Sequence, residues 1–135
     1  MEMNMVKQPE QETGCGVAVF AMLTHMKFEK SLAYLLKGGW VGPRRHHMTT
    51  IQMKAALGAY FDKKAVRVSN HSTVSAWSAV YVVYCERYRH WVAFDGKRFF
   101  DPLKQARGPS DSIRRKITRT VSVNMGLSTR VGDYV

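Results

Sequence analysis

The hydrophobic pattern of the chain changes character about halfway along its length. In residues 15 to 28, CGVAVFAMLTHMKF, apolar side chains fall on every face of a helix instead of along one stripe. This pattern predicts a helix buried in the middle of a domain. Residues 31 to 37 read as a second short helix, and Gly38 and Gly39 predict its end.

A third helix is predicted after the loop WVGPRRHH, residues 40 to 47. Thr49 or Thr50 can supply an oxygen for its N-terminal cap. Its apolar positions are Ile51, Met53, Ala56, Leu57 and Tyr60. Residues 1 to 62 are therefore expected to be mainly helical.

From residue 63 onward the pattern is typical of strands. Residues 65 to 68 and AVYVVYC, residues 79 to 85, are rich in β-branched and aromatic side chains, and HWVAF and KRFFD follow closely. Beyond Ser110, a short helix through Ile113 and Ile117 and a strand with alternating Val121 and Val123 are expected. Residues 63 to 135 thus form a mainly strand half with a basic C-terminal segment, and the fold class is α+β.

Asp95-Gly96 between two apolar runs predicts a two-residue type I′ hairpin turn. If Phe94 faces Lys97, the register places His90 directly opposite Asp101. The Cβ atoms of such a pair lie about 4.5–5.5 Å apart, so the imidazole can donate a hydrogen bond to the carboxylate. The residue after Asp101 is a proline, which lacks an N–H and ends the strand.

Length and composition place limits on the molecule. With 135 residues and 45% hydrophobic content, the chain is expected to form one domain, residues 1 to 135. No run approaches the roughly 18 apolar residues of a membrane span, and the first residues lack the order of a secretory signal. A soluble, cytoplasmic protein is expected, with Cys15 and Cys85 reduced.

The charge is strongly positive, with 21 Lys and Arg against 10 Asp and Glu, a net charge of +11. Residues 103 to 120 hold six basic residues against Asp111 alone. Helix-turn-helix, zinc and aromatic-basic RNA motifs are lacking, so a solvated basic face is the simplest interpretation. The alternative is an acidic partner, whether protein, nucleic acid or membrane surface, bound through Arg114, Arg115 and Lys116.

The candidate chemistry centres on TGCG, residues 13 to 16, where Cys15 stands between two glycines at a predicted helix start. A thiolate attacks a carbonyl, and the positive end of a helix dipole together with a protonated His90 would favour that thiolate. Gly14 and Gly16 are expected to let a substrate backbone approach and to leave the Cys15 N–H free for an oxyanion. A second oxyanion donor could come from Gln8 or Gln11.

The segments KQPEQETGCGVAVFAML and YRHWVAFDGKRFFDPL resemble the papain-like cysteine peptidases, most closely the double-glycine, bacteriocin-processing peptidase family. The resemblance implies a papain-like fold, in which a buried N-terminal helix carries the nucleophile and packs on a small antiparallel sheet. It implies that Cys15 is the nucleophile, His90 the general base and Asp101 the residue that orients it. Gln8 would match the oxyanion glutamine, although that residue usually precedes the nucleophile by six positions and Gln8 precedes Cys15 by seven.

The sequence therefore predicts a cysteine peptidase that cleaves peptide or isopeptide bonds of a protein or peptide substrate, without a cofactor. A papain-like acyltransferase or deamidase, or an inactive basic binding protein, are the alternatives. Cys85 is interpreted as a buried hydrophobic residue. His46 and His47 lie in a basic loop without further ligands at metal-binding spacing, so a metal site is not predicted there.

Overall fold

The computed structural model describes residues 3–9, 14–69, 80–85, 90–103, 108–112 and 117–124, and for 80–85 the backbone alone. In these residues the helices are α1 (Cys15–Thr24), α2 (Phe28–Lys37) and α3 (Thr50–Phe61), followed by the short 3-10 helix η1 (Lys63–Ala65). The strands are β1 (Val66–Ser69), β2 (Val80–Cys85), β3 (His90–Phe94), β4 (Phe99–Phe100) and β5 (Arg119–Val123). The predicted α+β class is confirmed.

The strands form one antiparallel sheet in the order β1-β5-β2-β3-β4. The late strand β5 lies between β1 and β2, so that Val121 pairs with Val68 on one side and with Val82 on the other. Val121 and Val123 are fully buried, as their alternation predicted, and the intervening Ser122 is buried as well. A strand from late in the chain therefore lies inside the sheet, between two strands that precede it in the sequence.

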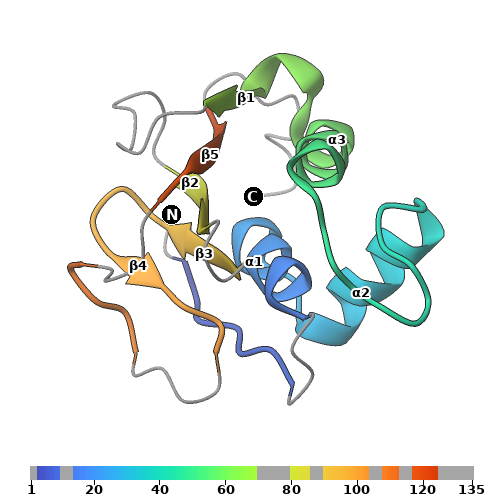
Figure 1. Ribbon diagram of the computed structural model, residues 1–135, viewed down its shortest axis with the longest axis horizontal. Helices are drawn as coiled ribbons and strands as arrows, with labels where there is room; N and C mark the ends of the chain where they lie inside the picture. The colour runs from blue at the N-terminus through green and yellow to red at the C-terminus, as the bar shows by residue number, and fades with distance from the viewer. Residues whose placement is uncertain are drawn as a thin grey trace.

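Helix α1 lies between the sheet and the other two helices (Figure 1). It packs against β3 on one side and against α2 on the other, and all ten of its residues are buried. Ser31 of α2 donates a hydrogen bond to the Val17 carbonyl at 2.9 Å, which joins the two helices inside the core. The apolar residues on every face of α1 are explained by this position, because each face meets a different partner.

The first helix is shorter than the sequence predicts, since it ends at Thr24 and not near residue 28. His25 adopts the left-handed conformation with φ 59°, and Phe28 already begins α2. The hydrophobic pattern continues across this break because Met26 and Phe28 also pack against the core. Periodicity alone therefore does not reveal where α1 ends.

The C-terminal end of α2 and the start of α3 agree with the prediction, whereas α2 begins at Phe28 and not at Ser31. A Cβ on Gly38 would lie 2.0 Å from the Trp40 ring, so Trp40 can fold back only over a glycine. In α3, Thr49 forms a capping box with Gln52. Ile51 was predicted to share the apolar positions of α3, but it is 81% exposed at the beginning of the helix.

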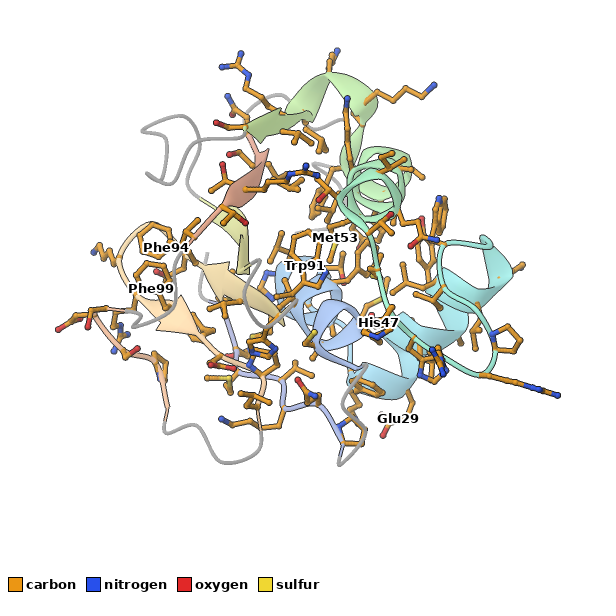
Figure 2. The ribbon with its side chains drawn as sticks, viewed as in Figure 1. Glu29, His47, Met53, Trp91, Phe94 and Phe99 are labelled. Atoms are coloured by element: carbon orange, nitrogen blue, oxygen red, sulfur yellow. The ribbon has the colours of Figure 1, made fainter. Side chains whose placement is uncertain are left out.

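The predicted hairpin register is wrong. Phe94 pairs with Phe99, not with Lys97, so the loop contains four residues and not two. The Asp95 carboxylate accepts hydrogen bonds from the N–H groups of Lys97 and Arg98, both at 2.9 Å. These groups are thereby withdrawn from the strand ladder. The rings of Phe94 and Phe99 lie next to each other, with their centroids 4.6 Å apart (Figure 2).

Some predictions fall on residues that the structure does not describe. They include the basic residues Arg114, Arg115 and Lys116, and Ile113 of the predicted short helix. In the described part of the chain, no helix is long and apolar enough to cross a membrane.

Candidate active site

Cys15 is the first residue of α1 and is 3% exposed. The first bond of the helix runs from the Ala18 N–H to the Gly14 carbonyl at 3.0 Å, so the N–H groups of the first turn have no acceptor within the helix. They point toward the N-terminal side, where the helix dipole is positive. The thiol of Cys15 is therefore placed where negative charge is favoured.

The two flanking glycines serve a packing role that the sequence did not predict. A Cβ on Gly16 would lie 3.1 Å from the Met48 side chain, and one on Gly14 would lie 3.4 Å from Gln8 and from Phe28. Neighbouring side chains, and not open space for a substrate backbone, thus lie beside both glycines. The small residues allow Met48 and Gln8 to approach the chain on either side of Cys15.

His90 begins β3 and is 5% exposed. The next residue, Trp91, is fixed by a hydrogen bond from its Nε1 to the Met48 carbonyl at 2.9 Å. The His90 Nε2 lies 2.7 Å from Asp101 Oδ1. The pair predicted from the sequence is therefore formed, although the register that predicted it is wrong.

The contact forms because Asp101 lies one residue beyond the end of β4. In the observed register Asp101 follows the Ala93–Phe100 pair and would stand opposite Val92, two residues from His90. The Leu103 N–H donates to the same Oδ1 at 3.0 Å, so the chain turns back on the carboxylate. This turn, and not direct opposition in the ladder, directs Asp101 toward His90.

The electrostatics of His90 link it to both partners. Burial of the ring lowers the pKa of His90, but hydrogen bonds to Asp101 and to Cys15 and their negative charges outweigh it. The pKa therefore lies above its ordinary value of 6.5. Cys15, His90 and Asp101 thus form one interacting group, although they come from a helix, a strand and the segment after another strand.

Stability should depend on pH through this group. Because the folded-state pKa of His90 is raised, its contribution is fully present below the unfolded pKa near 6.5 and is lost as pH rises through the folded pKa. Asp101→Asn is expected to lower the free energy of unfolding by about 1–3 kcal/mol at pH of about 5.5. Urea unfolding of both proteins up to pH of about 8.5 should show this difference shrinking as pH rises. A difference that grows with pH would contradict the assignment.

Gln8 is 4% exposed and lies beside the residue that precedes Cys15, because its Cβ is the neighbour that a Cβ on Gly14 would meet. Its N–H donates to the Pro102 carbonyl at 2.8 Å. The structure therefore places Gln8 beside Gly14, next to Cys15 in the chain, and against the segment that carries Asp101. The rival residue Gln11 lies outside the described residues.

Two residues at the site were not singled out from the sequence. Met48 contacts Gly16 and accepts from Trp91, and Lys7 donates to the carbonyls of Asp101 and Leu103. Neither belongs to a residue type or spacing that signals chemistry. Their positions follow from contacts between segments that are far apart in the sequence.

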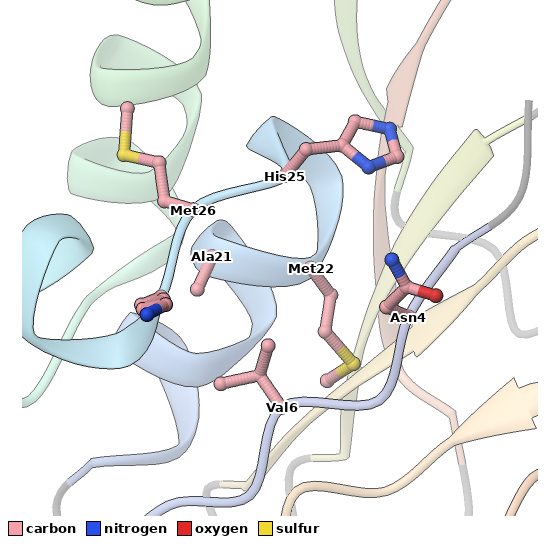
Figure 3. A pocket seen from close by; sticks show the side chains of 7 residues that line it. Asn4, Val6, Ala21, Met22, His25 and Met26 are labelled. Carbon is pink, nitrogen blue, oxygen red and sulfur yellow. The ribbon is translucent and has the colours of Figure 1, made fainter.

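A cavity of about 230 Å³ lies at the other end of α1 from Cys15 (Figure 3). It is lined by Asn4, Val6, Ala21, Met22, His25, Met26 and Lys27. Its walls are largely apolar, and none of the three residues of the candidate triad lines it. Across the described ranges, no group of three or more His, Cys, Asp or Glu residues could hold a metal ion.

Comparisons with known proteins identify the fold. No protein-family model matches the chain, and no curated protein matches it. Among solved structures it is similar to the crystal structure of a double glycine motif protease from an AMS/PCAT transporter in complex with the leader peptide. The TM-score is 0.57 at 15% sequence identity, and the match covers 90% of each chain. The chain has the papain-like cysteine peptidase fold.

Proposed function

We propose that the protein is a cysteine peptidase that cleaves a peptide or isopeptide bond through an acyl-enzyme. The observation that carries the proposal is the 2.7 Å contact between His90 and Asp101, with Cys15, at the start of a buried helix, close enough to raise the pKa of the same His90. A nucleophile, a base and an orienting carboxylate are thus joined in the order that acyl transfer requires. The papain-like fold supports the same conclusion.

The roles follow from the contacts. Since Nε2 of His90 faces Asp101, the other ring nitrogen, Nδ1, is left for the Cys15 thiol. Transfer of the thiol proton to His90 gives a thiolate and an imidazolium, and Asp101 stabilises the positive ring. The negative charge of the thiolate is stabilised by the imidazolium and by the positive end of α1.

In the first half of the reaction, Sγ of Cys15 attacks the carbonyl carbon of the substrate. The carbonyl oxygen then becomes an oxyanion. The Cys15 N–H and the side-chain amide of Gln8 are the proposed donors to that oxygen. The C–N bond then breaks, His90 gives its proton to the leaving amine, and a thioester remains on Cys15. Water, deprotonated by His90, next attacks the thioester, which releases the carboxylate product and the free thiol.

The same site would catalyse other acyl transfers with a different acceptor or substrate. An amine in place of water would make it an acyltransferase, and a glutamine side chain as the attacked group would make it a deamidase. We propose a peptide as the substrate, because the similar double-glycine protease was crystallised with a leader peptide. A reducing compartment such as the cytoplasm would keep Cys15 in its reactive form.

Digestion of a mixed peptide library in water labelled with heavy oxygen tests the proposal. Cleavage is expected, with one labelled oxygen in each new C-terminal carboxylate, as read by mass spectrometry. Incorporation of an added amine without labelled oxygen would identify an acyltransferase, and conversion of glutamine to glutamate without cleavage would identify a deamidase. Absence of all three products, together with a Cys15 of ordinary thiol reactivity, would exclude an acyl-transfer enzyme.

An inactive basic binding protein remains the second prediction from the sequence. Its proposed contact residues, Arg114, Arg115 and Lys116, lie outside the described residues. The surroundings of Cys15 favour the enzyme, because a binding protein does not require a buried thiol that raises the pKa of a buried histidine.

A further inference from the structure

Two consecutive residues near the N-terminus hold three consecutive carbonyl groups at the active site. The ammonium of Lys7 donates to the Leu103 carbonyl at 3.0 Å and to the Asp101 carbonyl at 3.4 Å. The Gln8 N–H donates to the carbonyl between them, that of Pro102, at 2.8 Å. Residues 3 to 9, the N-terminal segment, are thus connected to residues 101 to 103 by hydrogen bonds from Lys7 and Gln8.

The direction of the Asp101 carboxylate depends on this backbone. Its Oδ1 accepts both from His90 Nε2 and from the Leu103 N–H, so the turn over residues 101 to 103 sets the angle at which the carboxylate meets the imidazole. Pro102 has no N–H with which to hold the turn. The Lys7 ammonium contacts the carbonyls at both ends of the turn and restrains it from outside.

The same segment also carries Gln8 toward the nucleophile. Gln8 is buried beside Gly14, the residue before Cys15, and it follows Lys7 directly in the chain. A shift of Lys7 away from residues 101 to 103 would therefore change both the orientation of the Asp101 carboxylate and the position of Gln8. Lys7 is half-buried and its ammonium donates to two backbone carbonyls. It therefore restrains the backbone of residues 101 to 103 and does not act as a solvated surface charge.

We propose that Lys7 is a positioning residue of the active site, which holds the Asp101–Leu103 turn so that the Asp101 carboxylate meets His90 and Gln8 stays beside Cys15. The inference rests on the proposed function, because it assigns Lys7 to the catalytic group described above. Lys7 acts through Asp101 and Gln8 and has no part in bond making or proton transfer.

The test compares Lys7→Met, which keeps the alkyl stem and removes the ammonium, with Lys54→Met, which removes the same charge from an exposed site on α3. The probe is iodoacetamide, and the rate of Cys15 alkylation is followed by peptide mapping at pH of about 6.5. Lys7→Met is expected to slow alkylation by about tenfold, since small misplacements of reacting groups carry large rate penalties. Lys54→Met should react like the wild type, and Lys7→Arg, which can donate to both carbonyls, should stay within about twofold of it.

A second readout separates positioning from mere structural support. In histidine-labelled protein followed by NMR, the pKa of His90 should fall in Lys7→Met, because a displaced Asp101 carboxylate stabilises the charged ring less. If Lys7→Met does not fold, Lys7→Gln replaces the ammonium by a neutral amide on a shorter side chain. Its alkylation rate and its His90 pKa should then lie between those of the wild type and those expected for Lys7→Met.

The outcomes are distinct. Lower thermal stability in Lys7→Met or Lys7→Gln, with unchanged alkylation and unchanged His90 titration, would overturn the inference and leave the proposed function standing. A wild-type Cys15 that reacts no faster than an ordinary thiol, with or without His90, would overturn the proposed function and this inference with it.

Discussion

Cys15→Ala is expected to abolish peptide cleavage, with a loss in kcat/KM of about 10⁴-fold or more. In the proposed mechanism the thiol supplies the electrons that form the acyl-enzyme, and alanine has no atom that can replace Sγ. Cys15→Ser should lose nearly as much activity, because His90 and α1 are arranged around a thiol that ionises far more readily than a hydroxyl.

Cleavage of the best library peptide, followed by mass spectrometry, measures this effect. Because Cys15 is buried at the start of α1, the fold of each variant should be checked by circular dichroism and thermal unfolding. Cys85→Ala is the matched control, with the same substitution at a cysteine to which no role is assigned, and it should keep its activity. Cleavage that survives in folded Cys15→Ala would exclude Cys15 as the nucleophile.

His90→Ala is expected to remove the reactivity of Cys15 toward iodoacetamide near neutral pH, with a rate decrease of about 10–100-fold at pH of about 6.5. In the proposed mechanism the ring takes the thiol proton and remains beside the sulfur as an imidazolium. The raised pKa of His90 favours the charged form of the ring. Without the ring, the thiol has no neighbouring base to take its proton, so alkylation should be slow.

Peptide mapping separates Cys15 from Cys85, which serves as an internal reference in the same sample. His47→Ala is the control substitution, because His47 is an exposed histidine of the loop before α3 and should not change the rate. Asp101→Asn should give an intermediate rate, since it removes the negative charge that stabilises the imidazolium. Equal alkylation profiles for wild type and His90→Ala would show that His90 does not activate the thiol.

Local sequence signals predicted most of the elements, and they singled out residues that the structure brings together. The all-apolar stretch after Cys15 indicated a buried helix, and α1 is buried on every face. Gly38 and Thr49 marked helix boundaries that the structure shows, since both act through contacts within a few residues. Cys15 and His90 could be singled out because a cysteine between glycines and a histidine at the start of an apolar strand are local patterns.

The sequence by itself determined the helices, most of the strands and the residue types available for chemistry, because these depend on periodicity and on short-range hydrogen bonds. It did not determine the hairpin register. The observed register differs from the predicted one because the Asp95 carboxylate accepts hydrogen bonds from two N–H groups of the loop. Nor did the sequence reveal that Lys7 holds the turn containing Asp101, some 94 residues away in the chain. Such contacts are decided by the tertiary structure alone, because their free energy arises when packing brings distant segments together and leaves no periodic trace in either segment.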